Sequence, residues 1–152
     1  MLIRRGAAVA LILMLCSSLT GCWSRPLETN FFARSTSEGI ELLFCRSVEV
    51  TDLSITRVND TTKDDLHWEG AISWRSGDGD ALELKKIAGL PAGIGGMPLQ
   101  SGEWLSFSIE YRSGPGDPVS SIGAIRPPDT LGWPQGSWIG TDGKIHNSPC
   151  GA

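Results

Sequence analysis

The sequence lacks an excess of basic residues. It contains 13 lysines and arginines against 17 aspartates and glutamates, which gives a formal net charge of −4 at pH 7. Proteins that bind nucleic acid need clustered lysine and arginine to displace counterions from the phosphates. We therefore expect no nucleic-acid partner, and we expect no polybasic segment that would hold the protein on a membrane by charge alone.

The sequence also lacks the short motifs of familiar catalytic chemistries. It contains no Gly-x-Ser-x-Gly, Ser-x-x-Lys, His-Glu-x-x-His or Cys-x-x-Cys pattern and no phosphate-binding loop. The two histidines, His67 and His146, lie far apart and show no ligand spacing. The acidic turn at residues 78–80, with Glu83, does not fit a calcium loop, because Leu82 stands at a ligand position. We expect no cofactor, no metal site and no catalytic residue.

No apolar run in the chain is long enough to span a membrane. Residues 7–15 are apolar, but a transmembrane helix needs roughly 20 such residues. This run follows Arg4 and Arg5 and precedes small polar residues, which is the order found in a secretory signal peptide. We therefore interpret the N-terminal stretch as an export signal.

Residues 19–22, Leu-Thr-Gly-Cys, end this stretch and resemble the lipobox of bacterial lipoproteins. The resemblance implies that residues 1–21 are removed and that Cys22 becomes the first residue, acylated with chains such as palmitate. The lipid would anchor the protein in the cell membrane, facing the periplasm or the cell exterior. Trp23 replaces the aspartate of the inner-membrane retention signal, which favours the outer membrane in a two-membrane organism. The alternative is an ordinary secreted protein.

Cys45 and Cys150 remain once the leader is removed and Cys22 carries lipid. In an exported protein, such a pair is most simply a disulfide. The bridge would close a loop of about 100 residues, for which the chain-entropy model gives about 4.7 kcal/mol. The alternative is a metal or cysteine-histidine site with His67 or His146, which again lacks ligand spacing.

The part of the chain after the leader, roughly 131 residues, suits one domain. Residues 22–38 show no steady apolar period, and we expect them to form a lipidated tether that separates the domain from the bilayer. Phe31 and Phe32 leave open the alternative that this segment docks on the domain. The domain itself is expected over residues 39–152.

From Gly39 onward, apolar residues recur with a period of two, which is typical of half-buried strands. A change of parity at Thr51-Asp52 predicts a bulge, a twist or a short turn. The turn chemistry of residues 76–80 predicts a hairpin that pairs 66–75 with 82–87, and residues 88–98 contain too much glycine and proline for a regular element. Further strands are predicted at 40–45, 48–55, 66–75, 104–112 and 119–125, with a small hairpin over 137–146.

No apolar period of 3.6 residues persists over three turns after the leader. Short alternating strands between glycine and proline turns predict an all-β fold, an antiparallel β-sandwich with an immunoglobulin-like layout.

Tryptophan is abundant, with six residues against a single tyrosine. Trp68 and Trp74 share a face with Leu66 and Ile72, and we expect them to pack in the core. The apolar alternation of the strands does not assign the remaining tryptophans of the domain to the core. They are therefore candidates for binding a partner. The alternative is that they close the open end of the sandwich. These candidates are Trp104, Trp133 and Trp138.

These observations predict a non-enzymatic, membrane-anchored envelope lipoprotein that serves as a binding or accessory module for a protein or glycan. One alternative is an envelope hydrolase or metal-dependent enzyme that uses His67 or His146 with neighbouring carboxylates. Both histidines in one cleft with an aspartate would favour the enzyme, whereas separate surfaces would argue against it. A further alternative is a structural subunit that covers a partner's surface.

Overall fold

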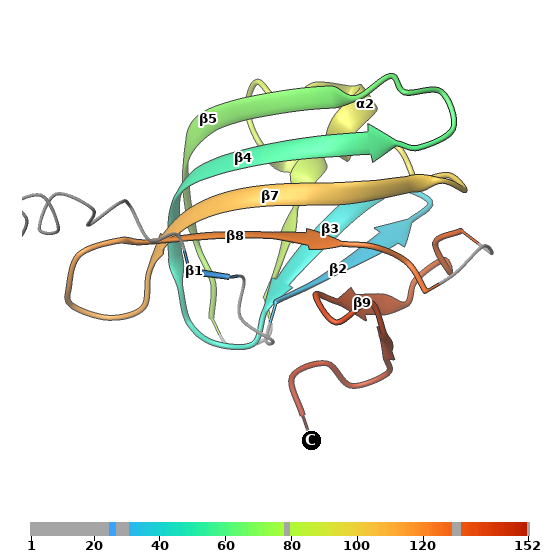
Figure 1. Cartoon of the computed structure of the whole chain (residues 1–152). Helices are drawn as coiled ribbons and strands as arrows, with labels where there is room; N and C mark the ends of the chain where they lie inside the picture. The colour runs from blue at the N-terminus through green and yellow to red at the C-terminus, as the bar shows by residue number, and fades with distance from the viewer. Residues whose placement is uncertain (1–24, 27–30, 78–79, 129–131, 152) are drawn as a thin grey trace, which may run out of the picture.

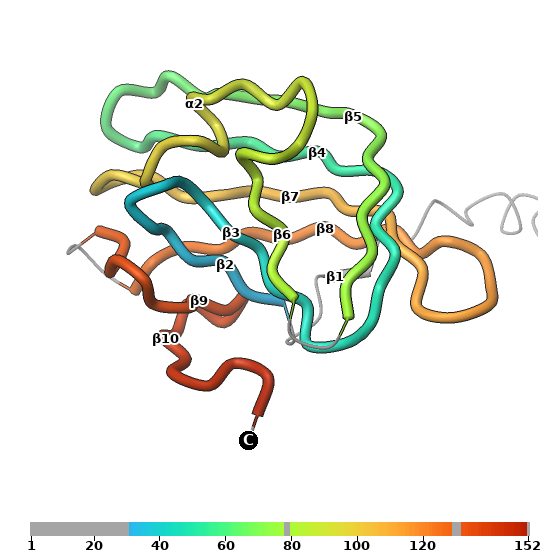
Figure 2. Tube along the Cα trace, turned by 180° about the vertical axis from the view of Figure 1, so that it is seen from behind, coloured from blue at the N-terminus to red at the C-terminus, as the bar shows by residue number. Residues whose placement is uncertain are grey.

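Alternating apolar residues build two β-sheets that pack face to face (Figures 1 and 2). The computed structural model describes residues 25–26, 31–77, 80–128 and 132–151. The first sheet, sheet A, has the strand order β1-β8-β7-β4-β5, and the second, sheet B, has the order β10-β9-β2-β3-β6. The predicted all-β sandwich is confirmed.

The strands of sheet A are longer than those of sheet B, except for the two-residue β1. Sheet A consists of β1 (Arg25–Pro26), β4 (Glu49–Asn59), β5 (Leu66–Arg75), β7 (Glu103–Arg112) and β8 (Val119–Ile125). Sheet B consists of β2 (Phe31–Thr36), β3 (Gly39–Phe44), β6 (Ala81–Glu83), β9 (Trp138–Gly140) and β10 (Ile145–His146). The 3₁₀ turn η1 (Leu84–Lys86) and the one-turn helix α2 (Ala92–Gly95) lie between β6 and β7.

The layout is immunoglobulin-like, as predicted. In sheet B, the neighbours β2-β3-β6 correspond to strands A, B and E of that fold, and β5-β4-β7-β8 of sheet A correspond to strands C′, C, F and G. Strands β9 and β10 extend sheet B beyond β2. In the described part of the chain, the strand pairs are antiparallel except for β1 with β8, which is parallel.

The core lies between the inward faces of the two sheets, where the period of two places the large apolar side chains. On β7, for example, Leu105, Phe107 and Ile109 are buried, while the residues between them face outward. Trp68 and Trp74 pack against this core from β5, as predicted, although both stay partly exposed. The fully buried side chains come from both layers and include Ile40, Leu42, Leu53, Ile55, Leu84, Ile94, Leu105, Ile109, Ile125 and Ile139.

The change of parity in the sequence marks a real irregularity. The register of β4 shifts between Val50 and Asp52 against both of its neighbours, β5 and β7. Val50, Leu53 and Ile55 can therefore all be buried although their spacing breaks the period of two. The predicted bulge is confirmed.

The expected tether over residues 22–38 is wrong for most of its described part. Residues 31–36 form β2, which pairs with β3 along its whole length, and Arg25–Pro26 form β1 on β8. The physical reason is burial, because Phe31 and Phe32 are each only 2% exposed. Of the two interpretations that the sequence left open, docking on the domain is correct. The leader and Cys22 lie outside the described residues.

The predicted hairpin between residues 66–75 and 82–87 is also wrong. After β5 the chain crosses to the opposite sheet, where β6 pairs with β3 and Leu82 lies opposite Leu42. The strand is only three residues long and continues into η1. Crossing allows Leu82 and Leu84 to join the core, whereas a hairpin on β5 would extend the edge of sheet A without closing the sandwich.

A buried arginine organises the glycine- and proline-rich excursion between β6 and β7. Arg57, which is 5% exposed, donates hydrogen bonds to the backbone carbonyls of Gly93 at 3.0 Å, Met97 at 3.2 Å and Pro98 at 2.8 Å. Its guanidinium also pairs with the carboxylate of Glu103. The excursion was expected to hold no regular element, and this is wrong at one point, because Ala92–Gly95 form the one-turn helix α2. One side chain holds the rest of the excursion at several points.

The structure joins Cys45 and Cys150 in a disulfide, as predicted, with 4.9 Å between the Cα atoms. Cys45 directly follows β3, and Cys150 lies in the C-terminal segment after β10. The bridge therefore fastens the end of the chain to sheet B. Among the described residues, no helix has the length and apolar character needed to cross a membrane.

Candidate binding face

The three candidate tryptophans do not form one site. Trp133 is buried, with 6% of its surface exposed, and its indole N–H donates to the carbonyl of Glu103 at 2.8 Å. The prediction that Trp133 contacts a partner is therefore wrong. Trp133 belongs to the core cluster, although its neighbours in the sequence are glycine and proline and show no apolar period. This agrees with the alternative that the tryptophan helps to close the sandwich.

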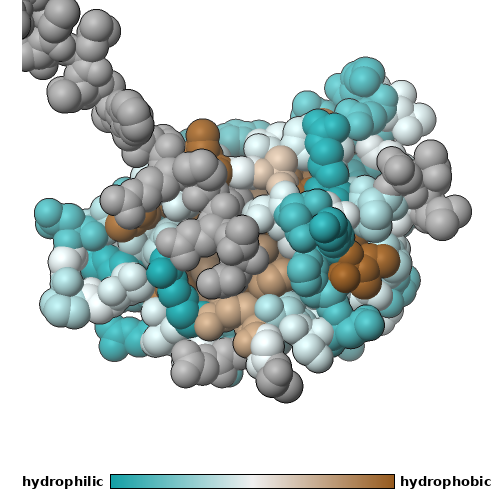
Figure 3. Space-filling view, turned by 60° about the horizontal axis from the view of Figure 1, so that its bottom comes forward, coloured by the Kyte–Doolittle hydropathy of each residue, from teal (hydrophilic) through white to brown (hydrophobic). Residues whose placement is uncertain are grey.

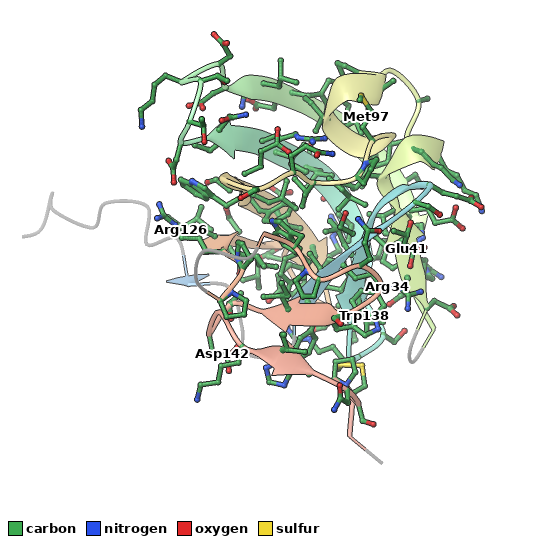
Figure 4. All side chains as sticks on the ribbon, turned by 90° about the vertical axis from the view of Figure 1, so that its right-hand side faces the viewer. Arg34, Glu41, Met97, Arg126, Trp138 and Asp142 are labelled. Carbon is green, nitrogen blue, oxygen red and sulfur yellow. A yellow bond between two sulfur atoms is a disulfide. The ribbon has the colours of Figure 1, made fainter. Side chains whose placement is uncertain are left out.

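Trp138 lies on β9 in sheet B, on the face that points away from sheet A. The guanidinium of Arg34 lies 4.3 Å from the centre of its ring, and Arg34 in turn pairs with Glu41 at 2.7 Å. Figure 4 shows these three side chains next to one another. Because Trp138 is partly covered by Arg34, it contributes less free surface than an isolated tryptophan would.

Trp104 is the first outward-facing residue of β7, on sheet A. Arg126 covers its ring at 3.9 Å, and its indole nitrogen is buried without a hydrogen-bond partner among the described residues. Val58 lies opposite it on β4. Trp104 and Trp138 thus belong to opposite sheets, and Trp104 borders a hollow in the surface.

That hollow is a shallow groove of about 650 Å³ across β4, β7 and β8 on the outer face of sheet A. Strand register places the outward residues opposite one another in two rows, with Ser54, Ser108 and the larger Ile122 in one and Thr56, Ser106 and Ala124 in the other. Serine, threonine, glycine and alanine supply six of the nine lining residues, and the large ones are Trp104, Phe107 and Ile122. The groove is lined by Ser54, Thr56, Trp104, Ser106, Phe107, Ser108, Ile122, Gly123 and Ala124.

The groove combines apolar surface with free hydroxyl groups. Ile122 is 48% exposed, and the hydroxyls of Ser54, Ser106 and Ser108 have no hydrogen bond to another described residue. Each serine hydroxyl can donate one hydrogen bond and accept others. The face can therefore hydrogen-bond a polar ligand while Ile122 and Trp104 contact its apolar parts. We call this hollow, with the residues that line it, the sheet A groove.

A second hollow, of about 430 Å³, lies where the sandwich opens between the edge strands β5 and β6. Its walls include Ile72, Trp74, Leu82 and Ile87, which already pack against the core. Lys86 and Glu83 at its rim pair with each other at 2.7 Å. Since its apolar walls belong to the core and its charged groups are paired, it offers a ligand fewer unsatisfied groups than the sheet A groove does.

The two histidines lie on different sheets. On β5, His67 contacts the hydroxyl of Thr56 through Nδ1 at 2.9 Å, whereas His146, on β10, contacts the Asp142 carboxylate through Nε2 at 3.1 Å. Burial raises the pKa of Asp142, but hydrogen bonds from the Lys144 backbone and the His146 ring outweigh it, so the net pKa lies below its usual value. The arrangement that would favour a joint histidine site is not found.

Metal-ligating side chains do not gather in the described part of the chain. Across residues 25–26, 31–77, 80–128 and 132–151, no group of three or more histidine, cysteine, aspartate or glutamate side chains is placed to hold a metal ion. On the face shown in Figure 3, the apolar residues form separate brown areas among hydrophilic ones, rather than one continuous patch.

Comparison with known proteins gives no relative for this chain. No protein-family model matches it, and neither the curated proteins nor the solved structures include a significant match. The class that can be stated is the one defined by the fold, an immunoglobulin-like β-sandwich with an added β9-β10 hairpin and a C-terminal disulfide.

The sequence identified Trp104 but not the groove beside it. The outward positions of β7 could be read from the alternation of Ser106 and Ser108 with Leu105, Phe107 and Ile109. Nothing in the sequence pairs these serines with Ser54 and Thr56, some fifty positions earlier, because that contact depends on the β4-β7 pairing.

Proposed function

We propose that this protein is an envelope lipoprotein, anchored by acylation of Cys22, whose sandwich binds a protein or glycan partner through the sheet A groove. The lipobox at residues 19–22 supports the anchor. The observation that carries the binding role is the groove itself, in which serine hydroxyls lie beside the exposed Ile122 and the half-buried Trp104 on the outer face of sheet A. A surface that combines apolar contact with hydrogen-bonding groups has the composition of a protein-recognition interface.

The anchor is tested by intact-mass spectrometry of protein extracted from membranes of the producing cell. We expect a chain that begins at Cys22 and carries acyl groups, and we expect Cys22→Ser to leave the uncleaved, unacylated precursor, because the thiol is the site of lipid attachment. Cys16→Ser is the matched control and should leave the mature mass unchanged. A mature chain without acyl groups would contradict the proposed anchor.

The binding face is tested by photo-crosslinking in intact envelopes. A photoreactive amino acid at Ser106 lies on the floor of the groove, and the same amino acid at Lys144 lies in an exposed turn of sheet B. We expect a discrete adduct from position 106 only, and we expect Ser54→Arg to suppress it by filling the groove from the neighbouring strand. Equal adducts from both positions, or none from position 106, would show that the groove is not the partner site.

A further inference from the structure

The pairing of β1 with β8 shortens the link between the proposed lipid and the domain. Only Trp23 and Ser24 separate Cys22 from β1, in which Arg25 lies opposite Ser121 of β8. An extended chain spans at most about 3.6 Å per residue, so the Cys22 Cα atom can lie no more than about 11 Å from that of Arg25. A lipid on Cys22 would therefore hold the edge of sheet A close to the membrane surface.

The direction of β1 identifies which end of the sandwich is nearest to the lipid. Because β1 is parallel to β8, its N-terminal side points toward the end of sheet A where β8 begins. Antiparallel pairing brings the last residues of β7 and β5 and the first residue of β4 to the same end, where Glu49 lies opposite both Arg112 and Arg75. Figure 1 shows this end on the left, beside the loop that joins β7 to β8. We call it the anchor end.

The anchor end carries two arginines around a small hollow. The hollow, of about 290 Å³, is lined by Ser47, Val48, Glu49, Arg75, Arg112 and Gly114. The side chain of Arg75 is 74% exposed and contacts Glu49 at 3.3 Å, and Arg112 is exposed. Both arginines therefore border the same hollow, and of the two, Arg75 is the one that pairs with Glu49. Guanidinium groups bind phosphate oxygens through two parallel hydrogen bonds, which suits them to lipid headgroups.

We propose that the anchor end lies on the membrane surface and that Arg75 and Arg112 bind the phosphates of lipid headgroups. This inference rests on the proposed acylation of Cys22. Asp117, in the adjoining loop, offsets part of the positive charge at this end. The lipid therefore provides the anchoring, and the two arginines only set the orientation of the domain. The strands of sheet A then lead away from the bilayer, and the sheet A groove, near the middle of β4 and β7, is held at a defined height.

Energy transfer to a headgroup dye tests this orientation in the full-length acylated protein. The protein is reconstituted in vesicles of phosphatidylethanolamine and phosphatidylglycerol with an acceptor dye on the headgroups. A donor dye is attached at Ser113→Cys, beside Arg112, or at Asp64→Cys, an exposed position beyond the other end of β4. Ten strand residues separate these ends by about 30 Å, so we expect severalfold greater transfer from position 113. Equal transfer from both positions, or greater transfer from position 64, would overturn the proposal.

The role of the arginines is tested with the same donor at position 113. Arg75→Gln with Arg112→Gln should reduce the transfer in vesicles that contain phosphatidylglycerol, and 0.5 M salt should do the same to the unsubstituted pair, by screening. Lys63→Gln removes a charge at the other end and serves as the control. The fold should survive, because surface ion pairs such as Arg75–Glu49 contribute little to stability. Transfer unchanged by both treatments would contradict the headgroup contact.

The intact mass of each sample separates failure of this inference from failure of the proposed function. An unacylated chain would overturn both the anchor and the orientation that depends on it. An acylated chain with equal energy transfer from the two positions would retain the lipoprotein and overturn only the orientation.

Discussion

Replacing Cys45 and Cys150 together with serine is expected to lower the free energy of unfolding by about 4 to 5 kcal/mol. The disulfide joins residues 105 positions apart, and the chain-entropy model assigns about 4.7 kcal/mol to a loop of roughly 100 residues. Whole domains are commonly stable by only about 5 to 15 kcal/mol, so this loss would leave the sandwich marginal. Urea unfolding of the double variant beside the parent protein measures the difference.

The local consequences of losing the bridge follow from what the C-terminal segment covers. The ring of His146 contacts that of Phe32 with 4.9 Å between their centres, and Phe32 is nearly buried although it points away from the core between the sheets. Gly140 permits this contact, because a Cβ atom there would lie 3.2 Å from the Phe32 ring. Without the bridge, amide exchange should accelerate first in residues 138–151, while β4 and β7 stay protected.

The control for this prediction is the effect of a reductant. Reduction should destabilise the parent protein to the level of the double serine variant and should not affect the variant further. Identical unfolding midpoints for the oxidised parent and the variant would show that the bridge does not restrict the unfolded chain in the expected way.

Strands with one face against the core and the other in water can be predicted from the sequence, because apolar and polar residues alternate along them. Residues 66–75 were predicted to form one strand, and β5 has these bounds, because one of its faces packs and the other is wet. A change of parity predicts the bulge near Asp52. A glycine turn between apolar residues likewise predicts the small hairpin of β9 and β10.

The sequence did not determine which strands pair over long distances. Residues 76–80 have turn chemistry that serves a hairpin and a crossing between sheets equally well, and three residues of β6 show too little alternation to choose a partner. The same limit applies to the sheet A groove, whose serines meet only through the β4-β7 register. Burial of Phe31 and Phe32 likewise depends on the tertiary fold rather than on a local pattern.

The alternation of inward and outward residues along β4 and β7 already indicates that two charged residues are buried. Arg57 shares the inward parity of Leu53 and Ile55, and Glu103 shares that of Leu105 and Phe107. A charged residue on the inward face of a strand needs a partner, because an isolated buried charge is very costly. The two residues could therefore have been predicted as a pair, although the three carbonyls that Arg57 also binds could not.

Replacing Arg57 with methionine is expected to destabilise the protein by about 3 to 5 kcal/mol, since it leaves the Glu103 carboxylate buried without its counter-charge. The same substitution removes the donors for the carbonyls of Gly93, Met97 and Pro98, and an unsatisfied buried polar group costs about 1 to 3 kcal/mol. Urea unfolding measures the global loss. Limited proteolysis should detect earlier cleavage within residues 88–98, which the guanidinium holds in place.

A double-mutant cycle with Glu103→Leu separates the ion pair from the loop anchor. Replacing both members of a simple buried ion pair by apolar residues is often nearly neutral. Here, the double variant should remain well below the parent, because the loop carbonyls lose Arg57 and the backbone N–H of Gln100 loses the Glu103 carboxylate that it contacts at 2.6 Å. Recovery of the parent's stability in the double variant would mean that Arg57 serves only to neutralise Glu103. Continued destabilisation, with the loop still open to protease, would identify Arg57 as the residue that gives a sequence rich in glycine and proline a single conformation.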